Sequence, residues 1–178
     1  MTSAITIPAP VPVTPNWAPF RLAPTGERGD LPRSISTIEG VSDRLRTAAF
    51  AEIQAREAFL WAASHFKDAE PALREAWLKL SAEENKHLHW LLRRMEELQL
   101  EVRDRTVSDQ LWISLTRCTS AREFALYMAN AEEWGRKAGE RFCDALLKTD
   151  PVTAQIFGQI AKEEVAHIAL AEKFFVAR

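Results

Sequence analysis

The sequence contains little cysteine and no paired cysteine motif. Its two cysteines, Cys118 and Cys143, lie far apart in the chain, and no CxxC pair is present. Structural zinc modules are commonly built on such pairs, so the sequence offers no site of that kind. Two isolated cysteines are typical of reduced thiols in a cytosolic protein, and we therefore expect a cytoplasmic location.

Long apolar runs and an excess of charge of one sign are also missing. No apolar segment approaches the roughly 18–20 residues that cross a bilayer, and the N-terminus lacks the basic lead-in of a signal peptide. The net charge of −2 provides no broad basic field, so we expect neither DNA nor a membrane as a partner. We expect a single soluble domain, because 178 residues with 47% hydrophobic content can bury a substantial core.

Proline is distributed unevenly along the chain. Seven of the nine prolines lie within residues 1–32, and proline rings prevent helix formation there. Residues 1–35 are therefore predicted to form an extended, proline-rich arm. Trp17, Phe20 and Leu22 are apolar enough to hold this arm against the body of the protein, and a disordered tail is the alternative.

Apolar residues recur at helical spacing from about residue 36 onward, which predicts an all-α domain over residues 36–178. The predicted long helices cover roughly residues 37–66, 71–98 and 120–148 and the segment from 150 onward, with a short helix at 108–117. Ser36 or Ser42 is expected to cap the first long helix and Ser120 the third. Asp150 should cap the last, with Pro151 as its first helical residue.

The lengths of the connections predict how these helices are arranged. Helices separated by only a few residues form antiparallel hairpins, so the first two long helices and the last two are expected to pair. The connection over residues 99–120 is long enough to cross the bundle. Two antiparallel hairpins joined by one long crossover make a ferritin-like four-helix bundle, which is the fold class that we predict.

Each predicted long helix carries one glutamate within its apolar stripe, and two helices also carry a histidine three residues later. Residues three apart share a helix face and can bind one centre. Glu52 and Glu84 are 32 residues apart, as are Glu132 and Glu164, so the whole pattern repeats after 80 residues. The candidate ligands are Glu52, Glu84, His87, Glu132, Glu164 and His167.

The charges of these residues favour a metal site. Four carboxylates facing one another in a core would repel and would be costly to desolvate. Two divalent cations balance the four negative charges when both imidazoles are neutral. Carboxylate and imidazole ligands suit iron or manganese, so the sequence predicts two Fe ions, with Mn or mixed Fe/Mn as alternatives.

Neighbouring acidic residues compete with these candidates. Glu133 follows a polar helix face, whereas Glu132 follows the apolar stripe, which favours Glu132 as the ligand. Glu83 and Glu163 precede the ligating glutamates and are expected to lie behind the ligands or on the surface. Glu57 points away from Glu52 and is expected to be exposed.

Several segments resemble a known family. AEIQAREAF, AEENKHLHWL, AEEWG and IAKEEVAHIALAEKFF are similar to an uncharacterised bacterial ferritin-like family, distantly akin to tRNA-modifying di-iron hydroxylases and rubrerythrins. The resemblance runs from about residue 34 to the C-terminus. It implies that Glu52, Glu84, His87, Glu132, Glu164 and His167 bind two irons.

Three functions are compatible with such a centre. We expect an O₂-dependent oxidase or oxygenase that acts on a small-molecule substrate and takes electrons from a donor. An iron-oxidising, iron-storage or peroxide-scavenging protein is the first alternative. A non-enzymatic bundle with a structural metal site is the second, and a homodimer is compatible with all three. The sequence does not identify the substrate.

Overall fold

The computed structural model of the chain describes residues 13–175. Within this range the chain forms five helices and two short strands: β1 (Arg21–Leu22), α1 (Ile38–His65), α2 (Pro71–Glu97), β2 (Thr106–Val107), α3 (Gln110–Leu115), α4 (Ala121–Leu146) and α5 (Pro151–Phe175). The prediction of an all-α protein is confirmed. None of the helices in residues 13–175 combines the length and apolar character that crossing a membrane requires.

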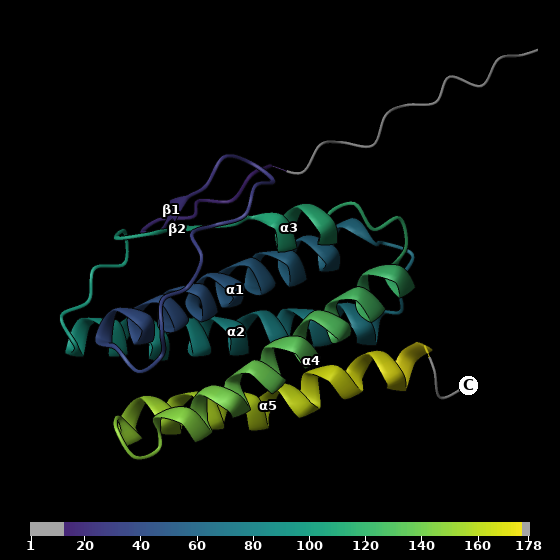
Figure 1. Cartoon of the computed structure of the whole chain (residues 1–178). Helices are drawn as coiled ribbons and strands as arrows, with labels where there is room; N and C mark the ends of the chain where they lie inside the picture. Colours follow the sequence, from purple (N-terminus) through teal and green to yellow (C-terminus); the bar gives the residue numbers. More distant parts are fainter. Residues whose placement is uncertain (1–12, 176–178) are drawn as a thin grey trace, which may run out of the picture.

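The long helices form two hairpins. α1 is joined to α2 by residues 66–70, and α4 is joined to α5 by residues 147–150 (Figure 1). Contacts within each hairpin are extensive, whereas α1 touches α4 and α2 touches α5 over much shorter stretches. Residues 98–120 run along the outside of α1 and place β2 and α3 there before α4 begins (Figure 1).

The first long helix begins with a different cap from the one predicted. Thr37 is extended, and its side chain accepts a hydrogen bond from the Gly40 backbone N–H at 3.1 Å. Ser36 instead contacts the hydroxyl of Ser34, and Ser42 is buried and accepts from the Arg46 guanidinium at 2.7 Å. The prediction of Ser36 or Ser42 was therefore wrong, because each hydroxyl is engaged by a residue nearby in the chain, Ser36 by Ser34 and Ser42 by Arg46.

The caps of the later helices are as predicted. The Ser120 side chain accepts from the Glu123 N–H at 3.1 Å at the start of α4. Asp150 accepts from the Thr153 N–H at 3.1 Å, and Pro151 is the first residue of α5. Each acceptor satisfies a backbone donor that the first helical turn leaves free.

The N-terminal arm is anchored to the body by aromatic packing. Trp17 and Phe20 are buried and lie 5.5 Å and 5.0 Å from the ring of Phe50. β1 pairs in parallel with β2, so the arm and the crossover form a small two-stranded sheet. The prediction that apolar arm residues lie against the body is therefore confirmed for this segment, and residues 1–12 lie outside the described range.

A buried ion-pair network fastens the arm, α1 and the crossover together. The Arg33 guanidinium and backbone N–H both donate to Asp43, at 2.8–2.9 Å. Arg46 donates to the same carboxylate at 2.8 Å and to the carbonyl groups of Glu101 and Val102. Burial alone would raise the pKa of Asp43, but the hydrogen bonds from Arg33 and Arg46 hold it well below its usual value.

Asp43→Asn is expected to lower the free energy of unfolding by about 3 kcal/mol at neutral pH, because Arg33 and Arg46 would lose the buried carboxylate that they share and keep only the half-exposed Asp104. A lowered folded-state pKa means that the contribution is complete above about pH 4 and is lost as the pH falls further. The difference from wild type, measured by urea unfolding, should shrink toward about pH 3. Asp144→Asn, at an exposed position of α4, is the control. A difference that stays constant with pH would contradict the assignment.

Candidate metal centre

The hairpins bring all of the predicted ligands to one place at mid-helix. Their ligand atoms form two overlapping groups, within each of which all atoms lie within 4.8 Å of one another. The first group is Glu52, Glu84, His87 and Glu164, and the second is Glu84, Glu132, Glu164 and His167. Two residues, Glu84 and Glu164, belong to both groups. The arrangement therefore has two potential cation positions with two shared carboxylates. We call these residues the carboxylate–histidine cluster.

The histidines turn their Nδ1 atoms toward the carboxylates. His87 Nδ1 lies 3.5 Å from an oxygen of Glu84 and 3.5 Å from one of Glu164. His167 Nδ1 lies 2.9 Å and 3.3 Å from the same two residues. The two rings lie 5.9 Å apart and nearly parallel. Each histidine therefore serves one of the two positions, and both are almost fully buried.

The opposite nitrogen of each histidine is held by a glutamate from the other hairpin. His87 Nε2 lies 2.8 Å from Glu163 on α5, and His167 Nε2 lies 2.8 Å from Glu83 on α2. Such a carboxylate partner favours the tautomer with the proton on Nε2, which leaves the Nδ1 lone pair free for a cation. Glu83 and Glu163 thus lie behind the histidines. Because each glutamate contacts the histidine of the opposite hairpin, these two contacts link α2 to α5.

Several buried polar atoms of the cluster lack hydrogen-bond partners, as expected for residues that bind a metal. Among the residues described, five buried atoms of the cluster have no hydrogen-bond partner: Nδ1 of His87 and of His167, and one oxygen each of Glu84, Glu132 and Glu164. Buried polar atoms are rarely left unpaired in proteins. All five are lone-pair donors directed into the same volume. The donor set therefore fits divalent cations and contains no thiolate.

Burial and mutual repulsion disturb the protonation of the cluster. Burial, followed by the charges of Glu164 and Glu84, raises the pKa of Glu132 well above its usual value. Burial also raises the pKa of Glu52. Burial would lower the pKa of His167, but the carboxylates of Glu164 and Glu84 close to its Nδ1 atom raise it to about 12. Without cations, protons must balance the carboxylates, so cation binding requires proton release.

Neighbouring acids are engaged elsewhere. Glu133 pairs with Arg136 at 2.6 Å and with Lys137 at 3.0 Å on the outer face of α4. Glu57 pairs with Arg56 at 2.7 Å. Its side chain is 24% exposed, so the prediction of an exposed residue was wrong, because the guanidinium of Arg56 covers it. Neither residue belongs to the cluster.

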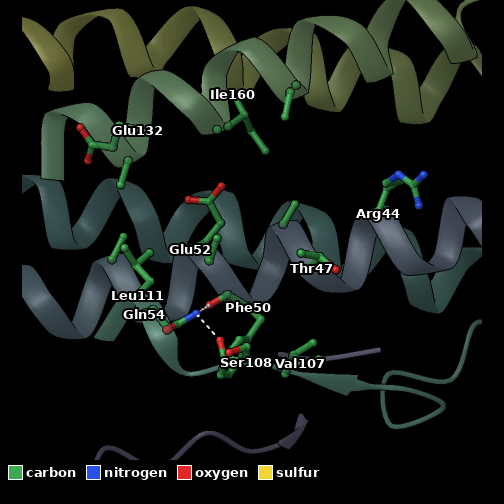
Figure 2. A pocket seen from close by; sticks show the side chains of 18 of the residues that line it. Arg44, Thr47, Phe50, Glu52, Gln54, Val107, Ser108, Leu111, Glu132 and Ile160 are labelled. Atoms are coloured by element: carbon green, nitrogen blue, oxygen red, sulfur yellow. Dashed lines mark hydrogen bonds between the residues drawn. The ribbon is translucent and has the colours of Figure 1, made fainter. Parts of the chain in front are cut away.

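A cavity of about 550 Å³ adjoins the cluster on its carboxylate side. Glu52, Glu84, Glu132 and Glu164 contribute to its lining, whereas His87 and His167 do not. Figure 2 shows Glu52 on α1 and Glu132 on α4 as parts of its wall. The side chain of Gln54 helps to close the base, because it donates to the Phe50 and Ser108 carbonyl groups and accepts from the Trp112 N–H.

Small residues on facing helices create this cavity. α1 contributes Ala48, Ala51 and Ala55, and α4 contributes Ala131, Gly135, Ala138 and Gly139. A Cβ atom at Gly135 would meet nothing within 4 Å. The cavity was not predicted from the sequence, although small residues at helical spacing beside Glu52 and Glu132 were the available signal.

Comparison with known proteins adds a family relationship. A family model described as "Protein of unknown function (DUF455)" matches residues 10–177, so the chain belongs to that family. No curated protein and no solved structure matches the chain. The description of the family states no reaction, so the chemistry must be inferred from the geometry of the site.

Glu132→Ala should reduce binding from two divalent cations per chain to one, because one group loses its own carboxylate while the other keeps all of its ligands. Glu133→Ala is the matched control, since the neighbouring carboxylate pairs with Arg136 and Lys137. The measurement is metal content by mass spectrometry after anaerobic loading with Fe(II). Retention of two metals by Glu132→Ala would show that the helix-α4 ligand is wrongly assigned.

Glu163→Gln and Glu83→Gln should each weaken one of the two cation positions by about 10- to 100-fold, because the histidine behind it loses its carboxylate partner. At saturating metal, both variants should still bind two cations. Titration with Co(II), followed by its visible absorption, separates the two affinities. Glu96→Gln, at an exposed position of α2, should bind as the wild type does. Unchanged affinities in all variants would rule out a supporting role.

Proposed function

We propose that this chain, a member of the DUF455 family, is a ferritin-like dinuclear metal protein, with iron as the metal, that uses O₂ to oxidise a small organic molecule. The observation that carries the proposal is a carboxylate–histidine cluster with two shared carboxylates that opens onto an apolar cavity. Metal ligands alone would support several functions. The adjoining cavity favours the oxidation of an organic substrate.

The helix arrangement supports the ferritin-like part of the proposal. α1 and α4 each supply one glutamate, and α2 and α5 each supply a glutamate followed three residues later by a histidine. A dinuclear carboxylate site inside a ferritin-like bundle uses this division of ligands. The connection over residues 98–120 also runs from one hairpin to the other along the outside of α1 (Figure 1).

Bound in the cluster, two ferrous ions would supply the electrons that activate O₂. Hydroxylation of a C–H bond places one oxygen atom in the product and releases the other as water. Besides the two electrons taken from the C–H bond, the balance requires two electrons and two protons. These electrons would come from the ferrous pair, an external electron donor would restore them after each turnover, and the protons would come from solvent. The proposal therefore includes a redox partner as well as a substrate.

The histidines and the carboxylates of the cluster lie on different sides of the two cation positions. His87 and His167 face away from the cavity and are fixed by Glu163 and Glu83. The carboxylates of Glu52 and Glu132 face the cavity and stand between the cation positions and any bound molecule. Apolar walls exclude water from this side and protect a reactive oxidant from competing reactions.

The iron-loaded protein, supplied with a chemical electron donor and ¹⁸O₂, should consume O₂ and place one labelled oxygen atom in a small molecule from a metabolite extract. Mass spectrometry identifies the labelled product. Gly135→Leu should keep both irons but lose the product, because the new side chain fills open cavity space. Glu132→Ala should keep one iron and lose both the second iron and the product.

Other outcomes separate the alternatives. Less than one iron per chain, or no O₂ uptake, would overturn the redox function and leave a structural site. Deposition of ferric mineral far beyond two irons per chain, unaffected by Gly135→Leu, would instead indicate iron storage. Rapid turnover of peroxide without labelled product would indicate peroxide scavenging.

A further inference from the structure

The cavity beside the cluster has two chemically different ends. Glu52 and Glu132 line one end, and Arg44 lines the other (Figure 2). Arg44 and Glu52 are on the same helix, with Thr47 and Ala48 between them along the cavity wall. The lining between the two ends is mostly alanine, glycine and larger apolar side chains such as Phe142 and Ile160.

Arg44 has no protein anion to neutralise it. Among residues 13–175, no ion pair or hydrogen bond engages its guanidinium, and its Nη1 atom is buried without a partner. Its contact is with the face of Phe142, at 5.6 Å from the ring centroid. Several other arginines with buried or half-buried side chains are paired with carboxylates: Arg33 and Arg46 with Asp43, Arg56 with Glu57, and Arg94 with Asp150.

Arg44 is half-buried, and a guanidinium partly removed from water beside apolar walls gains from a ligand that brings the counter-charge. Arg28 and Asp30 also line this cavity but are exposed. The Asp30 carboxylate accepts a hydrogen bond from the Thr106 N–H at 2.7 Å, and neither residue forms an ion pair within residues 13–175. An anionic group on a bound molecule would be attracted to Arg44 and repelled by the carboxylates at the far end. The charges therefore set the orientation of a ligand.

We propose that the substrate of this site is an amphipathic monocarboxylic acid, whose carboxylate pairs with Arg44 and whose apolar body extends through the cavity to Glu52 and Glu132. The inference rests on the proposed function only in that it calls the acid a substrate. Binding of the acid to Arg44 does not depend on that function. A guanidinium matches the planar, bidentate geometry of a carboxylate.

The dimensions of the cavity limit the size of the molecule. Arg44 and Glu52 are eight residues apart in α1, which places their Cα atoms about 12 Å apart at the usual helical rise. An extended aliphatic acid of about eight to ten carbons covers this distance, within the roughly 300–1,000 Å³ range of small-molecule pockets. The cavity volume of about 550 Å³ lies in that range. The end of the apolar body, rather than the carbon next to the carboxylate, would then face the cluster.

Binding of decanoate, decanol and decylamine to the full-length protein tests this inference by isothermal titration calorimetry below the micelle concentrations. Decanoate should bind at least about tenfold more tightly than decanol, whereas decylamine, whose ammonium is attracted to the carboxylate end, should not lose affinity in Arg44→Met. Arg44→Met should weaken decanoate binding by about tenfold and leave decanol unchanged, because only the charged contact is removed. Arg93→Met, on the exposed face of α2, is the matched control.

Gly135→Leu distinguishes the cavity from the surface, because it should weaken decanoate and decanol alike. Arg44→Met should also retain or increase the unfolding temperature of the wild type, since no internal ion pair is lost. Equal affinity of the wild type for decanoate and decanol, or unchanged decanoate binding in Arg44→Met, would overturn the inference.

Metal content and O₂ uptake of the same preparations keep the two proposals apart. Two irons and O₂ consumption without selective decanoate binding would overturn the monocarboxylate and leave the oxidase function. Selective decanoate binding through Arg44 in a protein that binds no iron would support the binding inference and overturn the oxidase function.

Discussion

The need to balance four carboxylates inside a helical core is the constraint on which the rest of this structure depends. Glu84 and Glu164 are almost fully buried and lie within a few ångströms of two further glutamates and two histidines. Such a cluster reduces stability unless protons or cations compensate it. The raised pKa values of Glu52 and Glu132 favour compensation by protons. The buried lone pairs without hydrogen-bond partners would allow compensation by cations.

The surrounding fold holds this centre rigid on one side and open on the other. Between α2 and α5, each histidine is fixed by a glutamate of the opposite hairpin, so the two ExxH helices are tied to each other at the centre. Between α1 and α4, small side chains leave space, and these helices contact each other only briefly. The Arg33–Asp43–Arg46 network and the aromatic contacts of Trp17 secure the arm and the crossover outside α1. The α2–α5 interface and the α1–α4 interface therefore differ in packing.

The cavity between α1 and α4 has groups of opposite charge at its two ends. The carboxylates at one end exclude an anion, and the unpaired guanidinium of Arg44 at the other end attracts one. The electrostatic pattern that makes the metal centre possible thus also restricts which molecules can approach it. In the proposed function, oxidation and substrate selection would both involve these turns of α1 and α4, whereas α2 and α5 supply the other four residues of the cluster.

The sequence by itself determined the helices, the all-α class and the identity of the clustered residues. These features follow from local periodicity, because residues three or four apart must share a helix face, and the 80-residue repeat separated Glu132 from Glu133. Only the tertiary structure decided which helix faces which. It therefore decided that Glu83 supports a histidine of the other hairpin. It also determined that Arg44 lacks a partner and that small residues on α1 and α4 border open space. Distances between helices result from packing across the whole molecule, and no local pattern contains them.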